Sequence, residues 1–269
     1  MTGDQKHSVD DINLKIKVKD EGRIDGDIYG AYYAKSELEE LHESLERAVN
    51  ALRNQLGRQI RSAAQNPPKE PYRYLNYFEL KHKSVFYGRE KDQKALLEKI
   101  CGDVREKRLT LLHAPSGAGK TSLLQAAIVP ALYDRGALPV YIHHPREPVE
   151  TIKKTLLPAA PHPEKFEKLP LLSTLSWATQ YLERDEELII LMDQFEEFFI
   201  HCSGRQQQPF INGLADCYYA ENLPVKFVLA MRKDYFSDMD KFSQNIEAIF
   251  QNRYLLSTLT RTVAIRAIK

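Results

Sequence analysis

The chain has 269 residues, of which 43% are hydrophobic and 28% charged. This composition excludes collagen-like, wholly disordered and membrane-embedded proteins, and 38 basic against 37 acidic residues give no broad field that would attract nucleic acid or an anionic membrane. The longest aliphatic run, Leu188 to Met192, is far shorter than the ~20 residues of a membrane-spanning helix. Three cysteines without C-x-x-C spacing indicate reduced structural thiols, so we expect a cytoplasmic protein.

The first 66 residues predict a small region ahead of the main domain. Residues 12–18 alternate apolar and polar side chains and three glycines follow between residues 22 and 30, a pattern that fits either a small hairpin or a mobile segment. Ser36 and Glu39 then form a capping box before apolar residues at spacings of three and four, which predicts a long amphipathic helix over 36–62. The helix fits packing on its own domain, and its near-heptad spacing leaves open self-association or docking of a protein partner.

Adjacent prolines at 67 and 68 cannot continue that helix and indicate a boundary. We therefore expect an N-terminal region over residues 1–66, a linker and entry segment over 67–88, and the main domain over 89–269.

Short apolar runs alternate with helical patterns in the main domain. Strands are expected over residues 108–113, 138–143, 188–193 and 225–231, and helices over 90–101, 121–133, 171–184 and 209–219. Such alternation predicts an α/β fold, namely the three-layer sandwich of P-loop NTPases with a mainly parallel sheet.

The first strand runs into a glycine-containing loop followed by a helix. The predicted nucleotide-binding residues of the loop are Ser116, Gly117, Ala118, Gly119, Lys120, Thr121 and Ser122. Glycines let backbone N–H groups curl closely around phosphates, Lys120 is expected to bridge the β and γ phosphates, and the Thr121 hydroxyl to bind Mg²⁺. Ala114 replaces the first glycine of the usual G-x-x-x-x-G-K-[ST] pattern. The alternative is a glycine-rich turn with a chance Lys-Thr pair.

The apolar strand over 188–193 ends in Asp193, where a P-loop protein needs a carboxylate for its Mg²⁺ shell. Glu196 and Glu197 follow, and one of them can position or deprotonate the attacking water. Both also suit the acidic first turn of a helix. A further strand ends in Arg232, which can sense the γ phosphate or simply belong to a surface basic pair.

These residues resemble the STAND nucleoside triphosphatases, and among them the mainly bacterial novel STAND NTPase 1 group. The segments that carry the resemblance are residues 71–78 with 86–90, 114–124, 193–198 and 228–236. The aspartate-glutamine-phenylalanine-glutamate-glutamate run from Asp193 to Glu197 is the most specific of them. Tyr74 stands where a glycine is usual, and Ala114 departs similarly; neither change removes a charged group.

The resemblance implies an ATP-dependent signalling switch with ATP and Mg²⁺ as its ligands. Its expected catalytic residues are Lys120, Asp193, Glu196 and Arg232; its expected metal ligands are Thr121 and Asp193. Residues 86–90, including Arg89, are expected near the adenine and sugar. Members usually continue into a winged-helix domain and sensor repeats that control self-assembly and an effector, so this chain is expected to be a truncated product.

Two other functions fit the same motifs. One is a scaffold that binds nucleotide without hydrolysing it; the other is an AAA-type remodelling ATPase, although the chain offers no clear arginine motif for a ring neighbour. The choice of ATP over GTP follows from the resemblance, supported by the lack of an N-K-x-D run.

Overall fold

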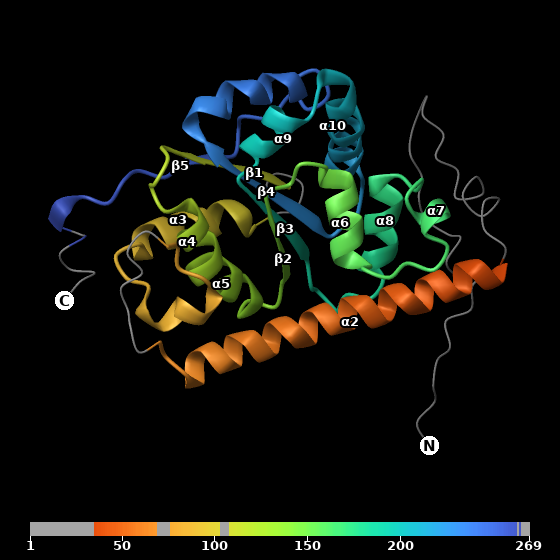
Figure 1. Cartoon of the computed structure of the whole chain (residues 1–269), viewed down its shortest axis with the longest axis horizontal. Helices are drawn as coiled ribbons and strands as arrows, with labels where there is room; N and C mark the ends of the chain where they lie inside the picture. The colour runs from red at the N-terminus through yellow and green to blue at the C-terminus, as the bar shows by residue number, and fades with distance from the viewer. Residues whose placement is uncertain (1–34, 69–75, 103–107, 263, 265–269) are drawn as a thin grey trace.

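The computed structural model describes residues 35–68, 76–102, 108–262 and 264 (Figure 1). The predicted N-terminal hairpin and residues 69–75 of the linker and entry segment lie outside the described residues.

A five-stranded parallel sheet in the order β2-β3-β4-β1-β5 forms the centre of the molecule (Figure 1). Its strands are β1 (Leu109–Ala114), β2 (Leu138–His143), β3 (Leu188–Asp193), β4 (Val225–Arg232) and β5 (Arg253–Leu255). Residues in β1 and β3 are all buried, as expected for strands covered on both faces. The predicted α/β fold with a mainly parallel sheet is therefore confirmed, whereas the short strand β5 was not predicted.

Two apolar clusters cover the two faces of the sheet. On one face lie α3 (Glu90–Ile100), α4 (Lys120–Ser122), a π-helical segment Leu123–Ile128 and α5 (Val129–Tyr133). The other face carries α6 (Pro148–Leu156), α8 (Leu171–Thr179), α9 (Glu196–His201) and α10 (Gly204–Tyr219), with the short α7 (Pro163–Phe166) nearby. Short 3-10 helices span Leu80–Val85 and Lys233–Phe242. These layers form the predicted three-layer sandwich.

Two predicted helix boundaries differ from the structure. The helix expected over 171–184 ends at Thr179, and the chain then turns toward β3 through Asp185, whose φ of 63° is left-handed. The helix expected to start at Pro209 starts at Gly204 instead, because Ser203 and Gln206 form a capping box. Pro209 therefore lies inside α10 rather than at its beginning.

The long helix α2 (Lys35–Gln65) confirms the helix predicted over 36–62 and crosses beneath both helix layers (Figure 1). Leu41, Leu45 and Val49 are at most 1% exposed and belong to the main apolar core. The apolar seam of α2 is therefore covered by its own domain. The predicted domain boundary near residue 66 remains a prediction, and α2 shares its core with the sheet.

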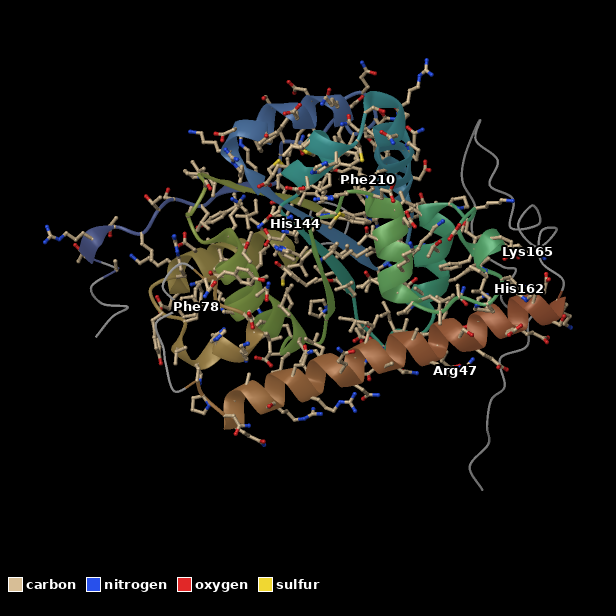
Figure 2. All side chains as sticks on the ribbon, viewed as in Figure 1. Arg47, Phe78, His144, His162, Lys165 and Phe210 are labelled. Atoms are coloured by element: carbon tan, nitrogen blue, oxygen red, sulfur yellow. The ribbon has the colours of Figure 1, made fainter. Side chains whose placement is uncertain are left out.

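The amino-terminal end of α2 contacts two polar residues from the α7 region. His162 and Lys165 lie beside it (Figure 2), and Lys165 Nζ donates to Glu37 Oε2 at 2.5 Å.

A buried histidine lies between α2 and α8. His42 is 6% exposed, its Nδ1 lies 2.7 Å from the Tyr181 hydroxyl, and its Nε2 has no hydrogen-bond partner within the described residues. Burial lowers the pKa of His42 below its ordinary value of about 6.5. Unfolding then favours proton uptake, because the unfolded chain binds the proton at a higher pH than the folded chain does.

We therefore expect the free energy of unfolding to decrease as the pH falls below about 6.5, with part of that decrease removed in His42→Gln. Urea unfolding of both proteins at pH 7.5 and 5.5 measures this difference in the free energy of unfolding. The fluorescence of the single tryptophan, Trp177, reports unfolding, since its ring lies 5.3 Å from that of His42. The same pH dependence in both proteins would contradict this assignment. His113, whose pKa is also lowered by burial, accounts for a residual slope.

Candidate nucleotide site

The glycine-containing loop lies between the end of β1 and the start of α4. Gly117 and Gly119 have φ angles of 74° and 93°, in the left-handed region that favours glycine. A Cβ atom at either position would meet nothing within 4 Å, so backbone conformation rather than space requires glycine there. Ala118 N donates to Pro115 O at 3.3 Å within this turn. Ala114, which replaces the usual glycine, is fully buried at the end of β1.

The loop leads directly into the helix through Lys120, Thr121 and Ser122. Lys120 is 8% exposed, and burial lowers the pKa of its amine while Glu196 and Asp193 favour its charged form. The Ser122 hydroxyl is engaged elsewhere, since it accepts a hydrogen bond from Phe78 N at 3.0 Å. Any contact of Ser122 with nucleotide would therefore involve its backbone.

Asp193 lies at the end of β3 and is fully buried. Its Oδ2 accepts hydrogen bonds from Thr121 Oγ1 at 2.6 Å and from the Tyr141 hydroxyl at 2.8 Å, while Gln194 N donates to Oδ1 at 2.9 Å. Burial works to raise the pKa of Asp193, but hydrogen bonds from His143, Thr121 and Tyr141 outweigh it and leave this pKa below its ordinary value. The carboxylate is thus held in its charged form.

A hydroxyl and a carboxylate converge at this point, and Mg²⁺ prefers such hard oxygen ligands. Thr121 and Asp193 are 72 positions apart in the sequence, yet Thr121 Oγ1 lies 2.6 Å from Asp193 Oδ2. The donor chemistry therefore fits the predicted metal.

The turn after β3 separates the two neighbouring glutamates. Gln194 has a φ of 55°, and Phe195 N donates to Ala230 O on β4 at 2.8 Å. This geometry directs Glu196 to the end of β4, where its Oε2 accepts a hydrogen bond from Arg232 N at 3.1 Å. Glu196 is 7% exposed and belongs to the same charged cluster as Lys120.

Glu197 faces a different group of side chains. It lies 2.9 Å from His201 Nε2 and 3.5 Å from Arg146 Nε, with His144 near it at 3.9 Å. Of the two glutamates, Glu196 is therefore the one brought to the phosphate loop.

Arg232 ends β4 directly beside Ala114, its partner in the parallel register. Its side chain is 42% exposed, and Nη2 lies 2.5 Å from Asp234 Oδ2. The guanidinium also lies 5.7 Å from the centre of the Tyr235 ring. The side chain is thus at the edge of the site, held by its own turn.

Arg89 binds the phosphate loop from the protein side. It is 6% exposed; Nη2 donates to Ala118 O at 2.6 Å, and Nη1 donates to Asp92 Oδ2 and to Ser257 O, both at 2.8 Å. Contact of Arg89 with the nucleotide remains a prediction, whereas its observed bonds join the loop to the segment after β5. Phe86 packs against Phe78, with ring centres 5.4 Å apart, which agrees with core packing.

Sequence reasoning missed two polar neighbours of Asp193. Tyr141 donates to it directly, and His143 Nδ1 lies 3.5 Å from its Oδ2. Both belong to β2, in which His143 is the register partner of Asp193. The sequence did carry a signal for these neighbours, since two polar residues stand at alternating positions near the end of an apolar strand.

A hollow of about 870 Å³ lies outside this cluster. It is bordered by α6, α7, α9 and α10, with His144 and Phe210 among its lining residues (Figure 2). His144 follows β2, so this hollow adjoins the Glu197 side of the turn.

The family model of the novel STAND NTPase 1 matches residues 71–269. The chain belongs to this family. As a novel STAND NTPase 1, it is a nucleotide-binding P-loop NTPase by family. No curated protein sequence matches it.

Solved structures give a more distant likeness to this STAND NTPase. The Walker-type ATPase PABY2304 of Pyrococcus abyssi has 16% identity and a TM-score of 0.49, covering 74% of this chain and 61% of that chain. Cdc6p from Pyrobaculum aerophilum has 20% identity and a TM-score of 0.46, with coverages of 67% and 48%. The ADP form of the Aeropyrum pernix ORC2 protein has 13% identity and a TM-score of 0.45, with coverages of 68% and 50%. The chain thus spans 48–61% of these proteins.

Within the described part of the STAND NTPase, every helix is too short or too polar to cross a membrane.

Proposed function

We propose that this STAND NTPase binds Mg-ATP, hydrolyses it slowly, and uses the nucleotide state as a switch for self-assembly or effector control. The observation that carries the proposal is the convergence of Lys120, Asp193 and Glu196, which come from the ends of three different elements around one loop. A buried lysine between two carboxylates at a left-handed glycine loop suits a triphosphate with its counterion.

Each residue then has a distinct task. The loop backbone and Lys120 hold the phosphates, and Thr121 with Asp193 would hold Mg²⁺. The metal, when bound, neutralises charge on the phosphate oxygens. Glu196 orients the attacking water, since its Oε2 is fixed by Arg232 N and its Oε1 forms no hydrogen bond within the described residues. Arg232 would reach the γ phosphate by exchanging its ion pair with Asp234 for one with the phosphate.

Hydrogen bonds connect the phosphate loop to the segment after β5, and the proposed switch would act through them. Arg89 joins the loop carbonyl of Ala118 to Ser257 O, and Tyr254 donates to Asp92 Oδ1 at 2.6 Å. A change at the phosphates therefore reaches the segment after β5 through one buried guanidinium. Any self-assembly would use surfaces other than the apolar seam of α2, which is already buried.

Lys120→Ala is expected to weaken Mg-ATP binding by about 10- to 100-fold, because a charge-assisted contact of about 1.5–3 kcal/mol is lost. Calorimetric titration of the full chain with ATP measures this, with Lys94→Ala, an exposed lysine on α3, as the matched control. Equal ATP affinity in both variants would overturn the site assignment. Wild-type binding without any turnover would instead favour the scaffold, and a comparison of ATP with GTP tests the base preference.

A further inference from the structure

A second hollow, of about 400 Å³, lies at the end of β1 on the face opposite the phosphate loop. Side chains alternate along β1: Leu112 and Ala114 pack with the helix that follows the loop, whereas Leu111 packs with the other core. His113 shares the side of Leu111 and lines the hollow together with Phe236. The hollow therefore lies behind the nucleotide site, separated from it by the sheet.

His113 is fixed but has no polar partner. Its ring stacks on Phe236 with centres 4.0 Å apart and planes within 19°, and Phe236 in turn contacts Phe250 at 5.3 Å. The residue is 8% exposed, yet neither ring nitrogen forms a hydrogen bond within the described residues, and Nδ1 is completely buried. A buried imidazole without a partner is unfavourable, so a ligand in the hollow that accepts an N–H from Nε2, the ring nitrogen that is not completely buried, would be stabilising.

Two cations line the same hollow. Lys233 and Arg253 are exposed, and neither forms an ion pair with another described residue. Both are close enough to His113 that, together with burial, they lower its pKa. Ser237 adds a hydroxyl, while Asp240 is the single carboxylate among the lining residues. Three nitrogen-bearing side chains therefore converge on the hollow, and the one carboxylate of Asp240 does not balance the two positive charges of Lys233 and Arg253.

We propose that the hollow formed by His113, Lys233 and Arg253 is a binding site for a phosphate group, separate from the phosphate loop. A dianion suits two unpaired cations, and the imidazole and the hydroxyl supply additional donors to its oxygens. The aromatic wall of Phe236 and Phe250 leaves room for an organic part. His113 lies in β1, which leads into the phosphate loop, and Lys233 directly follows Arg232 at the end of β4, so the ligand would lie close to both elements that lead into the nucleotide site.

A titration of the full chain with inorganic phosphate tests this site. NMR of ring-labelled histidines follows the binding, and a titration with chloride at matched ionic strength is the control for nonspecific anion effects. The signals of His113 are identified by their loss in His113→Asn. We expect them to shift in a saturable way, with a dissociation constant raised about tenfold in Lys233→Gln and in Arg253→Gln. Arg184→Gln, which changes an arginine whose side chain is 96% exposed, should leave the constant within about twofold of wild type.

The variant Lys120→Ala separates this site from the phosphate loop, and it should keep the His113 response. A response lost in Lys120→Ala but retained in Lys233→Gln and Arg253→Gln would overturn the proposal, as would the absence of a saturable shift. Phenyl phosphate identifies the source of the phosphate group. Equal affinity for it and for phosphate assigns the site to the free ion; tighter binding that weakens in Phe250→Leu assigns it to a phosphorylated aromatic molecule.

Discussion

Glu196→Gln is expected to lower the rate of ATP hydrolysis by about 100-fold or more while leaving ATP affinity within about threefold. Glutamine keeps the size of the side chain, and its amide oxygen still accepts the hydrogen bond from Arg232 N. It cannot, however, take a proton from water or hold it with a negative charge. The loss should therefore appear in the hydrolytic step and leave ground-state binding almost unchanged.

The neighbouring residue supplies the control for this experiment. Glu197 has the same chemistry and lies one position along the chain, yet it contacts His201 and Arg146. Glu197→Gln should therefore hydrolyse ATP within a few-fold of the wild-type rate. Single-turnover hydrolysis, measured beside equilibrium ATP binding, distinguishes the two variants. A hydrolysis defect confined to Glu197→Gln would contradict the proposal, because it would show that Glu197 rather than Glu196 positions the water.

The glutamates also show how far the sequence predicts the site. Asp193 could be placed because it ends an unbroken apolar run, and such runs become parallel strands buried on both faces. Residue types alone left Glu196 and Glu197 open, and the family resemblance favoured Glu196. The structural reason for that choice is the left-handed turn at Gln194, which follows only from the tertiary structure. The contacts of Tyr141 with Asp193 likewise depend on the pairing of β2 with β3, which no local pattern specifies.

The fold was predictable to a similar depth. The four longer strands have apolar runs that predict them. By contrast, β5 has only three residues, of which Arg253 and Leu255 are exposed, so only its pairing with β1 shows that it is a strand. The start of α10 was missed although Ser203 and Gln206 carried a readable capping signal. Arg89 was assigned to the nucleotide from resemblance, and its bonds to Ala118 O and Ser257 O follow only from tertiary structure.

Removal of Arg53 is expected to lower the free energy of unfolding by about 3 kcal/mol, because it leaves a buried carboxylate without its partner. Arg53 Nη2 lies 2.6 Å from Glu186 Oε2, and Nε donates to Glu186 Oε1 at 3.2 Å. Their side chains are 14% and 7% exposed. Nη2 also donates to Tyr181 O at 3.1 Å, so this guanidinium fastens α2 to the turn that precedes β3.

Urea unfolding of Arg53→Met, compared with Arg47→Met, measures this contribution. Arg47 belongs to the same helix but is exposed on its outer side (Figure 2). Among the described residues it bonds only to Ser44 and Glu43, so its loss should cost at most about 0.5 kcal/mol. The double variant Arg53→Met/Glu186→Leu should recover part of the stability, because the unpaired carboxylate is then absent. Equal stabilities of Arg53→Met and Arg47→Met would show that the apolar seam alone holds α2 on the domain.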